Sequence, residues 1–253
     1  MPKFAELSTY AGAIAPVIGA VHVNVHAAAR AVGRELSGAP DPSPGFLNDL
    51  RFTLPLRPLT RAALAAVYRY GTADERESIV QEHLEQGALT EDPDGLLHAT
   101  AHGLEIIHSL YGLHAAAVER IWPDHDVPAL ATLARSVLTR AQQDLSTTAH
   151  PSGHSAEAVG GAFAVVVPPY EPADAPPGVL LFNRLAALRY HRADAHAAAW
   201  QEAGLSVADI VALKRGPIRE RIEARTNQRA ARPYRILSEA ERARLYDGLL
   251  RLV

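Results

Sequence analysis

The chain has 253 residues, of which 48% are hydrophobic, so it is long enough for one large domain or two ordinary ones. It contains no cysteine, which excludes disulfides, thiol nucleophiles and thiolate metal sites. No apolar run approaches the roughly 18 to 20 residues of a membrane span, and no signal-peptide core follows the first residues. We therefore expect a globular, cytoplasmic protein that has no membrane partner.

The formal net charge of −3 conceals an uneven distribution. Residues 214–235 hold eight basic and two acidic side chains, whereas residues 1–213 hold 14 basic and 23 acidic ones. A basic segment of this kind suits a nucleic acid, an anionic ligand or an acidic partner. It is equally typical of a solvated helix face that lies against the acidic remainder of the same chain.

A segment rich in Ser, Thr, Gly and Pro divides the chain. It predicts a linker over residues 146–177, between a domain of residues 1–145 and a domain of residues 178–253. Within this linker, residues 163–167 (Phe-Ala-Val-Val-Val) have the composition of a short strand.

The first domain contains two helix signals in succession. Thr60 is a helix-capping residue, and the helix that follows it should reach about Tyr70. A turn at Gly71-Thr72 then precedes a second helix, which we expect over residues 73–86.

A hairpin and a long helix should come next. Leu89-Thr90 and Leu96-Leu97-His98 flank the acidic turn 91–95, which is typical of a β-hairpin. Thr100 should cap a helix that reaches Trp122, where Pro123 ends it.

The order helix, helix, hairpin, long helix is that of a winged helix. The segment from Gly87 to Gly103, which includes Asp94-Gly95-Leu96-Leu97-His98, resembles the wing and following turn of MarR-type regulators. The resemblance covers about 65 residues and implies a MarR-like winged helix. Helix signals in residues 178–253 separately predict a C-terminal domain of four helices, so we expect a mainly α fold.

The helix that reads DNA in that family corresponds to residues 73–86. Its outward positions are Asp74, Glu75, Ser78, Gln81, Glu82 and Glu85, which carry four carboxylates and no cation. Because Lys and Arg supply most non-specific DNA affinity, we expect no groove contact here, and DNA contact only through residues 214–235.

A winged helix that does not bind DNA can instead serve dimer or partner contact. The expected helix 101–122 carries an apolar stripe that could make a homodimer, composed of Leu104, Ile107, Leu110, Tyr111, Val118 and Ile121. His114 lies on the same side, where a histidine is usually a hydrogen-bonded core residue.

His22 and His26 are the pair with the spacing of metal ligands. On a helix they stack at i and i+4, which is compatible with zinc, but two ligands do not make a site. Polar residues flanking an apolar stripe explain them as well. We therefore predict no metal site, and the sequence identifies no cofactor.

The most informative segment is Arg189-Tyr190-His191-Arg192-Ala193-Asp194-Ala195-His196, inside a helix expected over residues 178–203. Pro177 should begin this helix and Gly204 should end it. A helical wheel places Arg189, Arg192 and His196 on the side of Leu181, Phe182, Leu185, Leu188 and Trp200. An arginine directed into a core requires an anion as its partner.

A second expected helix, residues 217–230, repeats this feature, because Arg225 and Arg229 share the stripe of Ile218 and Ile222. Arginines from two helices could converge on a carboxylate or phosphate. The candidate ligand-binding residues are Arg189, Tyr190, His191, Arg192, Asp194, His196, Arg225 and Arg229.

Internal salt bridges would explain the same arginines. Possible partners are Glu202, Asp209, Glu220 and Glu223. His191 and His196 lie about 140° apart on the wheel, so one helix cannot direct both at one ion. Asp194 lies nearer His191 and could orient it.

The segment Leu188–Leu205 is similar to the Arg-x-His-Arg-x-Asp-x-His helix of a bacterial family of helix-turn-helix proteins. Members of that family join such a helical domain to a MarR-like winged helix. The resemblance implies an architecture and does not supply an activity.

These observations favour a regulator or sensor in which the winged helix contacts a partner and the helical domain binds a small anion. The sequence is also compatible with an enzyme that uses His196 or His191 in acid–base catalysis while Arg189 and Arg192 hold an anionic substrate. A DNA-binding transcriptional regulator or a purely structural interaction module would fit the same pattern.

Overall fold

The computed structural model describes residues 4–37, 45–148 and 161–253, which are mainly helical. In chain order, the elements are α1 (Leu7–Ser37), α2 (Gly45–Leu50), α3 (Arg61–Val67), α4 (Ala73–Glu85), β1 (Leu89–Glu91), β2 (Leu97–Ala99), α5 (Ala101–Ile121), α6 (Val127–Thr148), α7 (Ala162–Val166), α8 (Pro177–Glu202), α9 (Val207–Ala212), α10 (Pro217–Ala230), the 3₁₀ helix η1 (Arg232–Ile236) and α11 (Glu239–Leu250).

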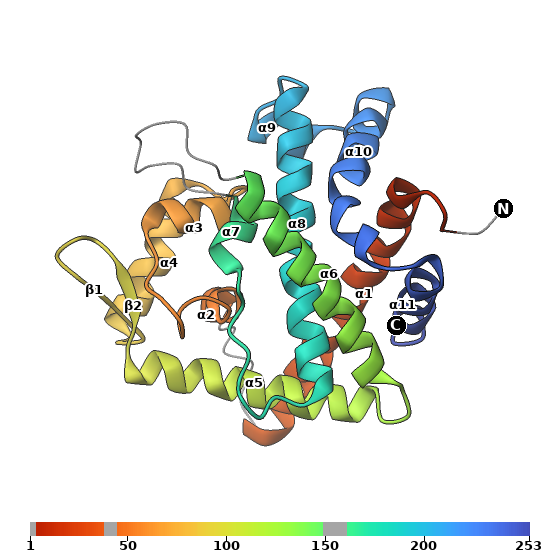
Figure 1. Cartoon of the computed structure of the whole chain (residues 1–253). Coiled ribbons are helices and arrows are strands. Elements are labelled where there is room, and N and C mark those ends of the chain that lie inside the picture. Colours follow the sequence, from red (N-terminus) through yellow and green to blue (C-terminus); the bar gives the residue numbers. More distant parts are fainter. Residues whose placement is uncertain (1–3, 38–44, 149–160) are drawn as a thin grey trace.

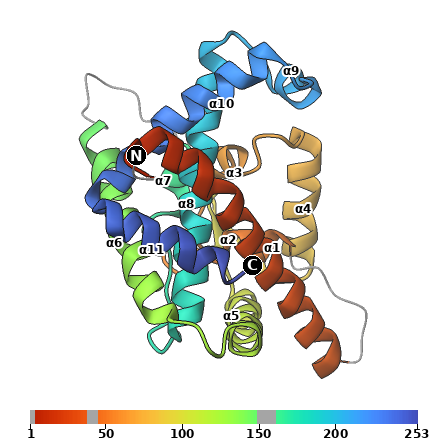
Figure 2. The ribbon, with the colours of Figure 1, turned by 90° about the vertical axis from the view of Figure 1, so that its right-hand side faces the viewer.

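Helix α8 lies at the centre of a helical bundle (Figure 1). It packs against α6 and α10, and also against α1, α5 and α7. The long helix α1 crosses the bundle and contacts α5, α8, α10 and α11, so the two ends of the chain share one packed structure (Figure 2). As expected, Pro177 begins α8, and Gly204 follows its end with a φ of 74°.

One hydrophobic core includes buried side chains from Phe4 to Leu252. It draws on both sides of the predicted division and on Phe163, Val165 and Val166 within the predicted linker. A smaller cluster, centred on Trp200, joins the end of α8 to α9 and α10. These last elements project from the rest of the bundle (Figure 1).

The expected order of helix, helix, hairpin and long helix is present in α3, α4, β1–β2 and α5. Thr60, Thr72 and Thr100 each accept a hydrogen bond from a backbone amide in the first turn of the helix they precede. The hairpin pairs Leu89 with Ala99 in antiparallel register. Helix α3 ends at Val67, three residues before the expected end.

Residues 163–167 do not form the expected strand. Residues 162–166 form the short helix α7 instead, and the carboxylate of Asp194 accepts hydrogen bonds from the first two amides of that helix, those of Ala162 and Phe163. The apolar composition therefore reflects burial against α8 rather than a sheet.

Helix α1 is long and apolar enough to cross a membrane by length and composition, which corrects the expectation that no segment reaches that limit. One such helix is weak evidence for a span, because core helices of globular proteins meet the same criterion. Here Tyr10, Ile14, Val21 and Val25 are fully buried in the protein core.

The apolar stripe of α5 also belongs to the core of this chain. Ile107, Leu110, Tyr111 and Val118 are buried, and α5 packs against α1, α2 and α8. The stripe is therefore covered by the chain's own helices and is not an open surface for a second copy.

Candidate functional site

The face of α8 that carries the arginines borders an open cleft of about 410 Å³ between α8, α10 and α1. Three of the predicted site residues line it, namely Arg189, Arg192 and His196. The remaining lining residues are Ala15, Pro16, Tyr70, Ala193, Glu223 and Thr226. The size and the charged lining of the cleft make it a candidate ligand site.

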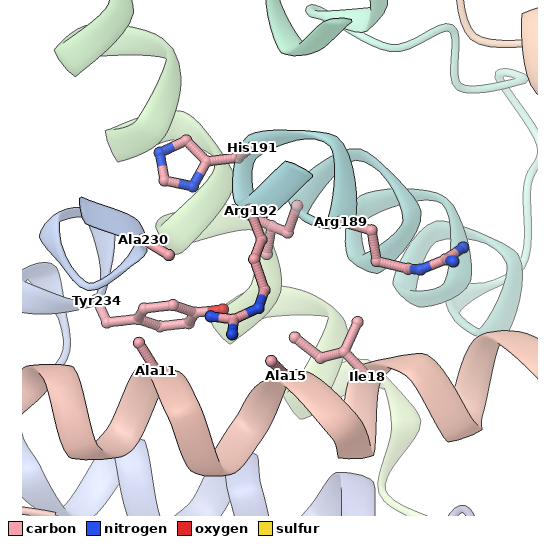
Figure 3. Close-up of a pocket in the computed structure, with 9 residues that line it drawn as sticks. Ala11, Ala15, Ile18, Arg189, His191, Arg192, Ala230 and Tyr234 are labelled. Atoms are coloured by element: carbon pink, nitrogen blue, oxygen red, sulfur yellow. The ribbon is translucent and has the colours of Figure 1, made fainter. Parts of the chain in front are cut away.

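Arg192 meets a glutamate of its own chain. Its Nη2 donates a hydrogen bond to Oε2 of Glu223 at 3.2 Å, and its side chain is 26% exposed. Its Nη1 is buried and has no hydrogen-bond partner among the described residues. Figure 3 shows the guanidinium extending from α8 toward Tyr234 and α1. Arg192 thus borders the cleft, but Glu223 already binds its guanidinium, and its unpartnered nitrogen is not exposed to solvent.

Arg189 differs from the expectation, because its side chain is exposed rather than directed into the core. It forms no hydrogen bond or ion pair within the described part of the chain. Figure 3 shows it extending along α8, away from Tyr234. Partial desolvation by the surrounding protein lowers the pKa of its guanidinium, which nevertheless keeps its charge at neutral pH.

His196 is held by the neighbouring helix α10. Its Nδ1 lies 3.2 Å from Oγ1 of Thr226 and 3.9 Å from Oε1 of Glu223. The Thr226 hydroxyl donates its proton to the Ile222 carbonyl at 2.8 Å, so His196 must be the donor to Thr226. This assigns the proton to Nδ1 and leaves Nε2 with a free lone pair in the neutral ring.

Burial is the main influence on the protonation of His196. It lowers the pKa of the imidazole below its ordinary value of 6.5, while the carboxylate of Glu223 acts in the opposite direction. The ring is therefore neutral at pH 7. Because its side chain is 25% exposed and borders the cleft, His196 is accessible to a ligand there.

Asp194 and His191 serve the packing of α8 rather than the cleft. Besides its bonds to α7, Asp194 forms an ion pair with Arg69, which follows α3. The His191 ring packs edge-on against Phe163 at 5.2 Å and points away from Arg192 (Figure 3). Asp194 therefore does not orient His191 through a hydrogen bond, which corrects the expectation.

Arg225 and Arg229 do not face the core. Both are exposed, and Arg229 forms an ion pair with Glu202 at 2.9 Å. The inward positions of α10 are Ile222, Thr226 and Ala230. Ile218, which suggested the other stripe, is 45% exposed in the first turn of α10. Tyr190 also lies outside the cleft lining, where its ring packs against Phe52.

A smaller hollow of about 30 Å³ adjoins the cleft and shares Ala15, Arg189 and Arg192 with it. Apart from the polar atoms of Arg189, Arg192, His191 and Tyr234, its lining is apolar, from Ala11, Ala15, Ile18, Leu188 and Ala230. This volume is about that of one water molecule or one methyl group.

The cleft also includes residues for which the sequence carries no signal. Ala15 and Pro16 come from α1, and Tyr70 follows α3, so all three lie in the other predicted domain. Nothing in the local pattern around these residues indicates a ligand site. Glu223 and Thr226 stand out in the sequence only as a possible ion-pair partner and a possible hydrogen-bonding residue.

A second cluster of polar side chains lies inside the bundle, around the ring of Phe182. His22, His26 and His114 lie 4.8–5.3 Å from Phe182, measured between ring centroids, and Cζ of Arg51 lies 5.3 Å from its centroid. Arg51 is only 1% exposed, and its Nε and Nη2 have no hydrogen-bond partner among the described residues. We call these four residues the Phe182 cluster.

The histidines of the Phe182 cluster are uncharged. Burial, together with the charges of Arg189 and Arg51, lowers the pKa of His22 to about 2 and that of His26 to about 4. His114 is 2% exposed, and its Nδ1 lacks the hydrogen bond expected of a core histidine. Within the described ranges, no group of three or more His, Cys, Asp or Glu residues is arranged to hold a metal ion.

Comparison with protein-family models, with curated proteins and with solved structures finds no match for this chain. Function must therefore be inferred from the geometry of the cleft and from the charges around it.

Proposed function

We propose that the protein is a regulator or sensor that binds a small anion in the cleft between α1, α8 and α10. The observation that carries this proposal is Arg189, a cation that borders the cleft and has no ion pair among the described residues. Arg192 lines the cleft beside it and is paired with Glu223. Planar guanidinium groups match carboxylates and phosphates well.

Binding should be tested by isothermal titration calorimetry and by thermal shift with a panel of anions. Arg189→Met keeps the aliphatic stem but removes the charge, and we expect it to weaken binding at least tenfold. Arg221→Met is the matched control, because it removes the same charge from an exposed position of α10 outside the cleft. The proposal fails if no anion binds, or if both variants bind as the wild type does.

The proposal includes a winged helix that contacts a partner. Three features support it: the order of α3, α4, the hairpin and α5; the bridge that pairs Leu59 with Leu97; and the exposed acidic face of α4. A homodimer would have to use this acidic face or another open surface, since the α5 stripe is buried. Analytical ultracentrifugation at micromolar concentration tests self-association. A monomeric mass would exclude the homodimer, and the partner would then have to be a different molecule.

A second candidate function is catalysis by His196. It is favoured by the assignment of the proton to Nδ1, which leaves Nε2 of a neutral imidazole free to accept a proton from a bound substrate. His191 has no part in it, because its ring points away. Ligands found by titration should be incubated with the protein and followed by NMR. Conversion by wild type but not by His196→Gln would establish this function, and unchanged ligands would exclude it for them.

A further inference from the structure

We infer that the cleft prefers a short-chain organic monoanion, a monocarboxylate, over dianions such as phosphate, and that Glu223 determines this preference. The inference rests on the proposed anion-binding function and concerns the class of ligand.

Among the described residues that line the cleft, one positive charge has no ion-pair partner. Arg192 and Glu223 neutralise each other through their ion pair, and His196 is neutral at pH 7. Arg189 is the remaining charge on the lining. One carboxylate matches it, whereas a dianion would bring a second negative charge toward Glu223. Like charges brought together in a partly desolvated site weaken binding.

Glu223 is in a position to exert this effect. Its carboxylate reaches Nη2 of Arg192 through Oε2 and lies 3.9 Å from Nδ1 of His196 through Oε1. The Glu223 carboxylate therefore contacts Arg192 and His196, the other two site residues of α8. A second negative group of the ligand would have to compete with Glu223 for Arg192. Glu223 thus acts as an internal anion that already occupies part of the site.

The adjoining hollow indicates the nature of the rest of the ligand. Its aliphatic wall consists of Ala15, Ile18 and Leu188, and Arg189, Arg192, His191 and Tyr234 complete the lining together with Ala11 and Ala230. Its volume of about 30 Å³ admits one methyl group. Burial of a methyl group against these aliphatic side chains is favourable. A short aliphatic carboxylate supplies both the single negative charge and the methyl group.

Propionate and malonate provide a direct test, because both have three carbon atoms and they differ by one negative charge at pH 7.5. Calorimetric titration in a low-chloride buffer should give a dissociation constant for propionate at least tenfold below those for malonate and inorganic phosphate. Glu223→Gln keeps the shape of the side chain and removes its charge. We expect it to shift the ratio of the two constants at least tenfold toward malonate.

Glu220→Gln is the matched control. Glu220 lies on the same helix, is exposed and does not line the cleft, so the propionate-to-malonate ratio should stay within about twofold of the wild-type value. An equal shift in both variants would overturn the role of Glu223.

The outcomes separate this inference from the function on which it rests. If none of the anions binds, the proposed function fails as well. If malonate or phosphate binds wild type as tightly as propionate, only the inference on ligand class fails. Should Glu223→Gln fail to fold, as judged by circular dichroism, the wild-type comparison of propionate with malonate still decides the ligand class.

Discussion

Asp194 and Phe163 are joined by a hydrogen bond of 2.8 Å, in which the backbone amide at the start of α7 donates to the carboxylate in the middle of α8. The same carboxylate accepts from Ala162 and forms an ion pair with Arg69. Asp194 therefore holds both the start of α7 and the segment after α3 against the central helix α8. Its place within the Arg-x-His-Arg-x-Asp-x-His segment suggests a ligand contact, but its partners indicate a structural role.

Asp194→Ala should therefore destabilise the fold without changing the cleft. Two charge-assisted hydrogen bonds and an ion pair are lost, so we expect the free energy of unfolding to fall by about 2–4 kcal/mol. Urea unfolding measures this change. Asp174→Ala, at an exposed position, is the control. If Asp194 instead contacted the ligand, the variant would lose anion affinity out of proportion to its stability.

A pair of glycines in α5 tests how closely the hairpin packs on that helix. A Cβ at Gly103 would lie 2.1 Å from the carbonyl oxygen of Ala88, whereas a Cβ at Gly112 would meet nothing within 4 Å. We expect Gly103→Ala to cost about 1–3 kcal/mol because the backbone of the hairpin must move. Gly112→Ala should stabilise by about 0.5–1 kcal/mol through its better helix propensity. Equal effects in thermal unfolding would contradict this packing.

The histidines of the Phe182 cluster predict that the protein loses stability in mild acid. Their pKa values are lower in the folded protein than the value of about 6.5 in the unfolded chain, so the unfolded chain binds more protons below that pH. Stability is then complete above about pH 6.5 and falls by about 1.4 kcal/mol per pH unit for each histidine as the pH decreases. Urea unfolding between pH 7.5 and 5 measures this slope.

The control for this slope is His102, which is exposed at the start of α5. His26→Gln should reduce the pH dependence by about the contribution of one histidine, and His102→Gln should leave it as it is. A wild-type stability that does not change between pH 7.5 and 5 would show that the cluster is hydrated or already charged in solution.

Arg51 has an unusual place for an arginine, because it is buried beside Phe52 and Phe182 with two of its nitrogens unmatched among the described residues. Its Nη1 donates to the carbonyl and side-chain oxygens of Asn48. Replacing an incompletely paired buried charge with an apolar side chain of similar length is often neutral. We expect Arg51→Met to lie within about 1 kcal/mol of wild type and to raise the pKa of His26, which NMR titration would show.

The stability of Arg51→Lys should be compared with that of Arg51→Met. Lysine carries a compact, strongly hydrated charge, so its desolvation in the same place should cost more than that of the guanidinium. If Arg51→Met proves several kcal/mol less stable than wild type while Arg51→Lys does not, the charge itself is needed in the core. Asp49, which accepts a hydrogen bond from Tyr68 at 3.0 Å, would then be the partner to examine.

The elements that could be predicted from the sequence are those with local signals. Thr60, Thr72 and Thr100 cap the helices expected after them, and capping boxes at Ser206 and Ser238 begin α9 and α11. These interactions span three or four residues, so the local sequence contains both partners. The helix α7 differs, because its capping carboxylate comes from Asp194, 31 residues away from Phe163. Without a local cap, its apolar run has the composition of a strand.

The candidate site was predictable only along α8. A helical wheel correctly groups Arg189, Arg192 and His196, since they line one cleft, but it does not show that the cleft is open to solvent. The wheel misplaces Arg225 and Arg229, because it treats Ile218 in the exposed first turn of α10 as a core residue. The local sequence does not indicate that Arg51 is buried, because the burial arises from contacts with Phe182 on a distant helix.

The basic segment 214–235 leads to a prediction about DNA. Lys214 and Arg215 are exposed between α9 and α10, in the part that projects from the bundle (Figure 2), while the outward face of α4 is acidic. We expect weak, sequence-independent binding of duplex DNA at about 20 mM salt that is lost near about 150 mM. In mobility-shift titrations, the double variant Lys214→Ser and Arg215→Ser should lower the salt slope by about two. Replacing Arg244 and Arg251, at the distant α11 end, with serine should leave the salt slope unchanged. If the protein does not shift the DNA even at the lowest salt, DNA contact through this segment is excluded.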